Sequence, residues 1–362
     1  MTAQRSAEST HPGHVDVERV LSVEELQERG RIAMGRSDYA AAANYFALAD
    51  KLAPRHDDAP GRLFNRAIRQ LVPRWHFAML NDEDRNTAYA TAIARAVRPG
   101  DVVLDIGTGT GLLAMLAARA GAAHVFSCEA EPLIADAARQ IIAANGYADR
   151  STVIDRKSTD LRVGVDLPAP ADVVITEIFD CALLGEDALP TLDHAREHLL
   201  VEGGRMVPAR GRLWGQLVAS DRLRAHNQVS TACGFDVSGF NRFRSLEYFS
   251  TYLGNHPHQP LTAPFPLLGL DFTADCPASR EVVKVVPTVD GTCDAIAFWF
   301  DLDLVPGVSL SNGPQHRETH WRQAVQTFEE PFRCEAGRPV PLEVRHDRER
   351  VLVLTDPRPW RI

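Results

Sequence analysis

The sequence predicts a mixed α/β protein: a doubly wound, Rossmann-like domain, with an antiparallel β-barrel domain after it and a small helical hairpin before it. Three observations predict this architecture. From residue 101 to about residue 208, short apolar stretches alternate with helical ones, as in a parallel sheet covered on both faces. Residues 209–362 hold short alternating stretches between Pro and Gly, which favours antiparallel strands. Residues 18–60 follow a helical period.

The composition limits the class of protein. The 362 residues exceed one typical domain, and the apolar share of 45% with 24% charged residues is that of a globular protein. The formal net charge of −9 disfavours nucleic acid as a partner and suits a cationic substrate. No apolar run approaches the ~18 residues that cross a bilayer, and the first residues lack an apolar signal region. We therefore expect a cytoplasmic enzyme without membrane contact.

The cysteine pattern gives no sign of a metal site. Six cysteines are scattered along the chain without a CxxC pair, which argues against a zinc site or a disulfide framework. We expect buried free thiols and no bound metal.

The region before the sheet has three parts. The polar residues 1–17 are expected to be a disordered lead. Within 18–60, SDYAAAANYFALADKLAP resembles the second half of a tetratricopeptide repeat, although an ordinary helical hairpin is the alternative. The Rossmann-like domain is expected over 61–208. It begins with a helix that Pro73 should break.

A glycine loop after the first predicted strand indicates a cofactor site. Asp105 precedes Gly107, Gly109 and Gly111 between a strand and an apolar helix, where an open α/β sheet binds ligands. Glycine lets the backbone approach a ligand, and GxGxG differs from the GxGxxG of dinucleotide folds. Glu129 ends the next strand and can accept both hydroxyls of a ribose. This pattern favours the phosphate-free, cationic S-adenosylmethionine.

A second loop carries paired acids that suit a planar cation. TEIFDCALLGE follows a later strand and places Glu177 and Glu186 around Asp180 and Gly185. Guanidinium has five donors in a fork and a pKa above ~12, so it reaches an enzyme charged. Two carboxylates can hold it bidentately and draw positive charge toward one side. The sequence therefore predicts that a guanidino nitrogen accepts a methyl group.

Five motifs together resemble the protein arginine methyltransferase family. They are VLDIGTGTG, the acid at Glu129, the double-glutamate loop with Glu177 and Glu186, the THW loop at 319–321, and MLNDEDRNTAY at 79–89, which looks like the family's cofactor-covering helix. The resemblance covers roughly residues 70–362. It implies a homodimer formed through an arm at about 221–260, which reaches the second subunit.

The resemblance also implies roles for single residues. Asp82 and His320 look like the family's pair that links the two domains, and the pair either accepts the released proton or serves as a bridge. The residues implied to contact the cofactor are His76, Met79, Arg85, Asp105, Gly107 and Ser158, beside Gly109, Gly111 and Glu129.

Departures from the family pattern concern the product. RAIRQLVPRWHFAML contains no tyrosine where the family has a tyrosine-rich helix. Asp180, and Gln323 after Trp321, resemble the monomethylating type III branch, whereas the hairpin resembles a branch that dimethylates symmetrically. We assign Asp180, Trp321 and Gln323 to control of substrate and product. The predicted main product is ω-N-monomethylarginine.

Three functions compete for these motifs. The first is methylation of free arginine or a small guanidino compound in bacterial natural-product biosynthesis. The second is methylation of Arg-rich protein segments, and the third is a non-enzymatic scaffold, against which the intact acids argue. Lysine occurs only at Lys51, Lys157 and Lys284, a skew typical of GC-rich bacterial genomes. Because no long acidic groove is readable in the sequence either, we favour free arginine.

Overall fold

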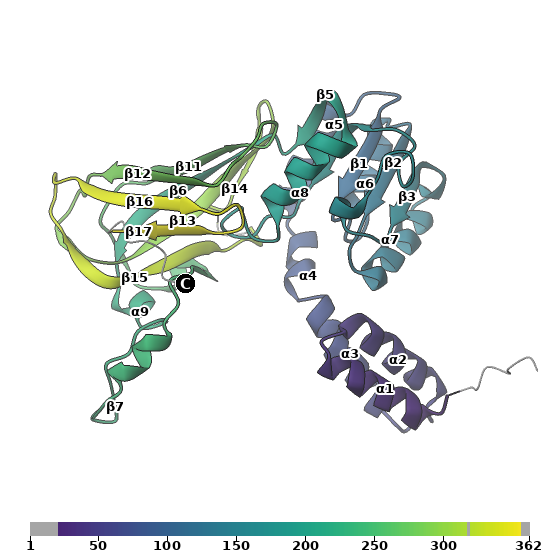
Figure 1. Ribbon diagram of the computed structural model, residues 1–362, viewed down its shortest axis with the longest axis horizontal. Coiled ribbons are helices and arrows are strands. Elements are labelled where there is room, and N and C mark those ends of the chain that lie inside the picture. Colours follow the sequence, from purple (N-terminus) through teal and green to yellow (C-terminus); the bar gives the residue numbers. More distant parts are fainter. Residues whose placement is uncertain (1–20, 317–318, 356–362) are drawn as a thin grey trace, which may run out of the picture. The chain divides into compact units, whose positions relative to one another are not determined.

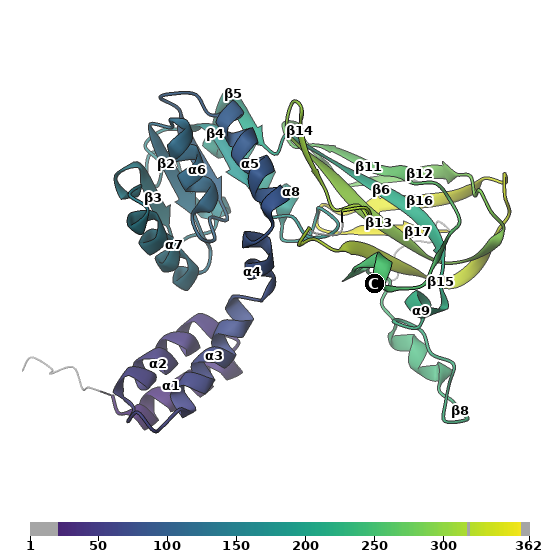
Figure 2. The ribbon, with the colours of Figure 1, turned by 180° about the vertical axis from the view of Figure 1, so that it is seen from behind.

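The chain forms two compact units. The computed structural model describes residues 21–316 and 319–355 (Figures 1 and 2). The first unit comprises Met1–Pro73 and the second Arg74–Ile362. The lead expected at 1–17 lies outside the described residues. Each unit is described by itself.

The described part of the first unit is helical. Its helices are α1 (Val23–Gly35), α2 (Tyr39–Leu52) and α3 (Ala59–Leu71), and α2 packs against both others. Ser22 and Glu25 form a capping box on α1. A Cβ atom at Gly30 would overlap the ring of the fully buried Phe46, so the glycine permits the close helix crossing. A third helix thus joins the pair expected within 18–60.

The predicted break at Pro73 is confirmed. Helix α3 ends at Leu71, and the short helix α4 (Trp75–Leu80) begins after the proline. Proline lacks the backbone N–H that the continuing helix would need. Helix α4 therefore belongs to the second unit.

The second unit contains the predicted parallel sheet. Its strand order is β3-β2-β1-β4-β5 and all neighbours are parallel. The strands are β1 (Val102–Ile106), β2 (His124–Cys128), β3 (Ser151–Ile154), β4 (Ala171–Thr176) and β5 (Leu200–Val207). Helix α5 (Glu83–Ala96) precedes β1, and the connections between strands contain α6 (Leu112–Ala120), α7 (Pro132–Ala144) and α8 (Ala188–His194), with a π-turn at Ala195–Leu199 and 3-10 turns at Ala148–Arg150 and Ser158–Asp160.

Apolar packing covers both faces of this sheet. Val103 packs in a cluster that contains residues of α5, α6 and α7, whereas its neighbour Leu104 packs in a second cluster that contains Leu199. Adjacent residues of a strand point to opposite faces, which explains the nearly continuous apolar strands. The order reverses between β1 and β4, where such sheets bind ligands.

Among the described residues, the domain predicted as a barrel contains two large antiparallel sheets and the two-stranded hairpin β7-β8 (231–236). The larger sheet runs β10-β6-β13-β15-β9, with β11 on β6 and β14 on β13, and the smaller runs β12-β16-β17. The larger contains β6 (Arg210–Ala219), β9 (Phe249–Thr251), β10 (Gln259–Pro260), β11 (Phe265–Asp271), β13 (Gly291–Val305), β14 (Val308–Ser311) and β15 (Gln323–Cys334). The smaller contains β12 (Ser279–Val285), β16 (Val340–His346) and β17 (Val351–Leu354).

The segment predicted as an arm is partly built into the larger sheet. Within 221–260, β9 pairs with β15 and β10 pairs with β6. The remainder holds α9 (Asp221–Arg224), the hairpin of β7 (Thr231–Ala232) and β8 (Phe235–Asp236), and 3-10 turns at Ser238–Phe243 and Leu253–Asn255. Phe235, Phe240 and Phe243 are 64–73% exposed there, so this part presents apolar surface.

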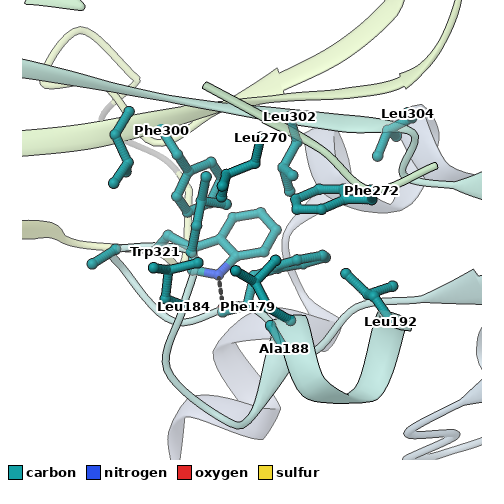
Figure 3. Close-up of a cluster of buried hydrophobic side chains, with 14 of the residues drawn as sticks. Phe179, Leu184, Ala188, Leu192, Leu270, Phe272, Phe300, Leu302, Leu304 and Trp321 are labelled. Atoms are coloured by element: carbon teal, nitrogen blue, oxygen red, sulfur yellow. Dashed lines mark hydrogen bonds between the residues drawn. The ribbon is translucent and has the colours of Figure 1, made fainter. Parts of the chain in front are cut away.

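An apolar core joins the two sheet domains within the second unit (Figure 3). Trp321 lies between Phe179 and Leu184, which follow the parallel sheet, and Phe300 of β13. The rings of Trp321 and Phe300 meet edge to face with centroids 5.2 Å apart. This core fixes the loop after β4 against the antiparallel domain.

Two further expectations can be compared with the structure. No helix within the described residues is long and apolar enough to span a membrane. Five of the six cysteines are buried free thiols, but Cys233 is exposed, so the expectation of burial is wrong there. Cys233 follows β7 in the hairpin of the arm, and a chain reversal of this kind leaves a side chain at the surface.

Candidate active site

Four loops meet at the carboxyl edge of the parallel sheet. The loop after β1 has positive φ angles at Gly107, Gly109 and Gly111, where glycine avoids strain. A Cβ at Gly107 would lie 2.9 Å from Ile178 Cγ2, whereas a Cβ at Gly109 would meet nothing within 4 Å. The loop is thus packed at its ends and open at its middle.

Asp105 provides a buried carboxylate beneath this loop. Its Oδ2 atom accepts hydrogen bonds from Thr108 Oγ1 at 2.6 Å and Ser127 Oγ at 3.1 Å. Its Oδ1 atom is buried and has no hydrogen-bond partner in the described part of the chain. Burial raises the pKa of Asp105 to about 6, although both hydroxyl donors oppose the shift. An ammonium group would satisfy the free oxygen.

Glu129 and Ser158 lie at the ends of the next two strands. The Glu129 carboxylate accepts the backbone N–H of Gly109 at 3.1 Å and that of Glu131 at 3.1 Å. These bonds place the carboxylate beside the open middle of the glycine loop. Ser158 is buried at the start of the 3-10 turn that follows β3.

Arg85 projects from α5 toward the end of β4. Its guanidinium is 4% exposed and donates to Glu177 Oε2 at 2.7 Å and to Asn86 Oδ1 at 2.9 Å. Its Nε atom is buried without an acceptor among residues 21–316 and 319–355. The guanidinium lies 5.2 Å from the ring of Tyr89, whose hydroxyl donates to Thr176 O at 3.0 Å. The unpaired Nε atom fits a ligand carboxylate, as the predicted cofactor requires.

His76 and Met79 lie on α4, which has no buried residue. His76 stacks on Trp75 with centroids 3.7 Å apart, and Trp75 and Phe77 are 44% and 63% exposed. Contact of His76 and Met79 with the cofactor stays a prediction, since the structure leaves this helix at the surface.

The loop after β4, residues 177–187, carries four acids, Glu177, Asp180, Glu186 and Asp187; we call it the acceptor loop. Glu177 is buried against Arg85, whereas Glu186 is accessible on the wall of a cavity. Desolvation of its carboxyl group by the surrounding residues, and repulsion from Glu177 and Asp180, raise the pKa of Glu186 to about 7. A cation bound beside these carboxylates would relieve the repulsion.

Asp180 does not extend freely into the cavity. Its Oδ1 atom accepts the backbone N–H groups of Ala182 and Gly185, and its Oδ2 atom accepts the Tyr248 hydroxyl. Any effect of Asp180 on the product therefore acts through the shape and charge of the loop.

Asp82 and His320 connect the two sheet domains. Asp82 caps α5, and its Oδ2 atom accepts from His320 N at 2.8 Å, His320 Nδ1 at 2.9 Å and Thr319 Oγ1 at 3.1 Å. Burial alone would raise the pKa of Asp82, but the hydrogen bonds from His320 and the Arg85 backbone lower it to about 2. The carboxylate is therefore ionised at neutral pH.

The side chains of Trp321 and Gln323 are both buried and hydrogen-bonded. Trp321 Nε1 donates to Phe179 O at 2.9 Å. Gln323 accepts from Leu253 N at 2.9 Å and donates to Asn312 O at 2.7 Å. These contacts position backbone around the acceptor loop, so their assignment to substrate and product control stays a prediction.

A cavity of about 1140 Å³ extends from the acceptor loop over the antiparallel domain. Acidic residues on its wall outnumber the basic ones, which are Arg345 and Arg350. The acids are Glu186, Asp187, Glu247, Glu329, Glu330, Asp347 and Glu349. This surface favours a cationic ligand.

Both sheet domains match known families. A family described as "Ribosomal protein L11 methyltransferase (PrmA)" matches residues 88–204, and the "Arginine methyltransferase oligomerization subdomain" matches residues 225–353. The arginine N(omega)-methyltransferase of Streptomyces achromogenes subsp. streptozoticus is 46% identical over 283 residues, which cover 78% of each chain. The chain belongs to the arginine N-methyltransferase family. The resemblance deduced from the five motifs is confirmed.

Other members of the arginine N-methyltransferase family are more distant. Mouse protein arginine N-methyltransferase 9 is 34% identical over 78% of this chain, which spans only 38% of the mouse protein. A solved structure titled as the PRMT1 enzyme-prozyme complex of Trypanosoma brucei with AdoHcy is 26% identical. It has a TM-score of 0.68 and covers 76% of this chain and 89% of its own. Arginine methyltransferase 10 of Arabidopsis thaliana, 24% identical with a TM-score of 0.61, shares the fold.

Sequence reasoning missed four residues that shape the site of this arginine methyltransferase. Thr108 and Ser127 bind Asp105, Tyr89 supports Arg85, and Tyr248 binds Asp180. Tyr89 could have been found, because it lies four residues after Arg85 on one helix face. No sequence signal points to Tyr248, which is 68 residues from its partner.

Proposed function

We propose that this arginine N-methyltransferase uses S-adenosylmethionine to convert free L-arginine, or a small guanidino compound, mainly to its ω-N-monomethyl form. The observation that carries the proposal is the placement of Glu177 and Glu186 on one loop beside the glycine loop. The Streptomyces relative, named an arginine N(omega)-methyltransferase without reference to protein, supports the small substrate.

The residues around the glycine loop fit the cofactor. Asp105 Oδ1 would accept its ammonium group, Arg85 Nε would donate to its carboxylate, and Glu129 would bind the ribose hydroxyls. When bound, S-adenosylmethionine supplies an electrophilic methyl carbon on a sulfonium. The glycine loop and α6 would hold the cofactor in place and would take no part in acid–base chemistry.

The acceptor loop would hold the guanidinium. Glu186, with a pKa of about 7, is only partly ionised at neutral pH until a cation binds beside it. Glu177 keeps one oxygen on Arg85 and has its other oxygen for the substrate. Together they would orient one nitrogen toward the methyl carbon, and transfer would depend on this alignment. The low pKa of Asp82 favours a bracing role for the Asp82–His320 pair.

The test supplies labelled donor with free arginine and, separately, with an Arg-rich peptide. We expect label on free arginine, and mass spectra of the product dominated by a single added methyl group. Label on the peptide alone would overturn the substrate assignment. Dimethylarginine as the main product of a single turnover would overturn the product assignment.

A second candidate substrate is an Arg-rich protein segment. The acidic cavity of about 1140 Å³ favours it, because the cavity is several times larger than one amino acid needs. Glu330→Gln and Glu349→Gln on its wall separate the two substrates. They should weaken peptide methylation and leave free-arginine methylation within twofold.

We further propose a homodimer formed through the arm. The match of 225–353 to an oligomerization subdomain and the exposed Phe235, Phe240 and Phe243 support it. Analytical ultracentrifugation of the full chain should give a dimer, and changing all three phenylalanines to serine should give monomers. A wild-type monomer at micromolar concentration would contradict the proposal.

A further inference from the structure

The acceptor loop has an unusual backbone. Leu183, Glu186 and Asp187 have φ angles of 71°, 66° and 58°, the left-handed region that non-glycine residues avoid. Such a backbone conformation is strained for a residue with a Cβ atom, and it persists only where surrounding contacts hold it. The contacts that hold this loop therefore also place Glu186.

The loop is wrapped around the carboxylate of Asp180. Its Oδ1 atom accepts from Ala182 N at 3.0 Å and Gly185 N at 3.1 Å. A Cβ at Gly185 would lie 2.5 Å from Asp180 Cγ, so glycine is required for the turn to close on this side chain. Gly185 directly precedes Glu186. The Asp180 carboxylate therefore fixes the backbone of Gly185, and through it the backbone of Glu186.

Tyr248 holds Asp180 from the antiparallel domain. Its hydroxyl donates to Asp180 Oδ2 at 2.6 Å. Its ring lies edge-on to Phe298 of β13 with centroids 5.4 Å apart, and the next residue begins β9. Burial and the nearby Asp180 carboxylate raise the pKa of Tyr248, so the hydroxyl keeps its proton. The Tyr248 hydroxyl therefore stays a hydrogen-bond donor at neutral pH, and its ring is held against β13 of the larger antiparallel sheet.

We propose that Tyr248 is a positioning residue for methyl transfer, which fixes the acceptor loop through Asp180 and so sets the direction of Glu186. The inference rests on the proposed function of Glu186. A tyrosine suits this role because a neutral hydroxyl binds the carboxylate without cancelling its charge. An arginine or lysine at the same place would neutralise Asp180 and remove its repulsion from Glu186.

Two substitutions separate the hydrogen bond from the charge. Tyr248→Phe removes the hydroxyl and leaves the Asp180 charge. Asp180→Asn removes the charge, but its oxygen can still accept the loop N–H groups and its amide can donate to the Tyr248 oxygen. Tyr147→Phe is the control, because its partly buried hydroxyl has no hydrogen bond to any described residue.

We expect Tyr248→Phe to lower kcat about tenfold, the factor that corresponds to one lost hydrogen bond, with donor affinity unchanged. The acid limb of its kcat/KM profile should stay in place. Asp180→Asn should keep kcat within a few-fold and shift that limb to lower pH. Glu177, whose charge also raises the pKa of Glu186, remains in every variant, as do the other charged groups on the cavity wall, including Arg345 and Arg350.

The double variant tests whether Tyr248 acts through Asp180. Tyr248→Phe with Asp180→Asn should lose no more activity than Tyr248→Phe alone, whereas two independent losses that multiply would overturn the proposal. So would a Tyr248→Phe enzyme with kcat within twofold of wild type, or one whose donor affinity falls in parallel. If wild-type enzyme transfers no methyl group to any guanidino compound, the proposed function itself has failed.

Discussion

The glycine loop and the acceptor loop lie at the same edge of the parallel sheet but reach positive φ angles in different ways. In the glycine loop, each such position is a glycine, and the neighbouring hydrogen bonds come from residues 105–131. In the acceptor loop, Leu183, Glu186 and Asp187 take these angles. Distant residues hold the acceptor loop, among them Tyr248, Asn312 and Trp321.

This difference shows which contacts hold the glycine loop and which hold the acceptor loop. The glycine loop, Asp105 and Glu129 are held by contacts within the parallel-sheet domain, whereas Arg85 reaches the acceptor loop through Glu177. The acceptor side needs the antiparallel domain to hold a strained loop, as expected where strain accompanies function. Substitutions that destabilise the antiparallel domain should therefore lower methyl transfer more than they lower affinity for the methyl donor.

The largest expected effect comes from removing the core that joins the two domains. Trp321→Ala should lower the free energy of unfolding by about 3–5 kcal/mol, the usual cost of deleting a buried large aromatic side chain. At temperatures where the variant stays folded, methyl transfer should fall far more than donor affinity. Thermal unfolding and donor calorimetry check this.

Trp321→Phe is the matched control for that variant. It keeps a ring but loses the bond to Phe179 O, which should cost about 1 kcal/mol. If Trp321→Ala lowered donor affinity as much as methyl transfer, the antiparallel domain would support both loops equally, which would contradict the contrast drawn above.

A smaller effect is expected at Asp105. The pKa of this buried carboxyl is raised to about 6, so its ionised form disfavours folding at neutral pH. Asp105→Asn should raise the free energy of unfolding by up to about 3 kcal/mol at pH 7, and this gain should vanish below about pH 4, where the unfolded chain is also protonated. Chemical denaturation at both pH values measures it.

Donor affinity should move in the opposite direction. Asn cannot neutralise the ammonium of the cofactor, so Asp105→Asn should bind it at least tenfold more weakly. Wild-type affinity should fall as the pH drops through about 6. A pH-independent donor affinity between pH 5 and 7 would remove Asp105 from the cofactor site.

The smallest effect on stability should come from Gly109→Ala. The added Cβ meets nothing within 4 Å, so only the strain of a positive φ remains, about 1 kcal/mol. Donor affinity should nevertheless drop, because that open space is where the cofactor is expected. Gly107→Ala should be worse for transfer, since its Cβ would press on Ile178 of the acceptor loop. Equal transfer by the two variants would argue against contact between the loops.

The same contrast explains what the sequence could predict. The cofactor loop can be predicted from the sequence because glycine occupies each of its positions with a positive φ angle, between the acids Asp105 and Glu129. The paired glutamates of the acceptor loop were visible as well, but its turn was not, since the residues there have no preference for that backbone. Trp321 contacts Phe179 over 142 residues and Asn312 contacts Cys181 over 131. Such pairings depend on the tertiary fold.

The arm shows a related limit. Strands β9 and β10, of three and two residues, are too short for alternation to reveal, so the whole of 221–260 looked like a projection. Their place in the sheet comes from pairing with the long strands β15 and β6.

The most direct test of the paired carboxylates is the transfer rate of Glu186→Gln at saturating donor, with Glu330→Gln as a control on the same cavity wall. The account predicts a loss of at least about a hundredfold for Glu186→Gln, with donor affinity unchanged and thermal stability equal to or above that of wild type, because the raised pKa of Glu186 means that its ionised form disfavours folding. It predicts less than a twofold change with free arginine for Glu330→Gln. A folded Glu186→Gln enzyme that transfers methyl groups at the wild-type rate would contradict it.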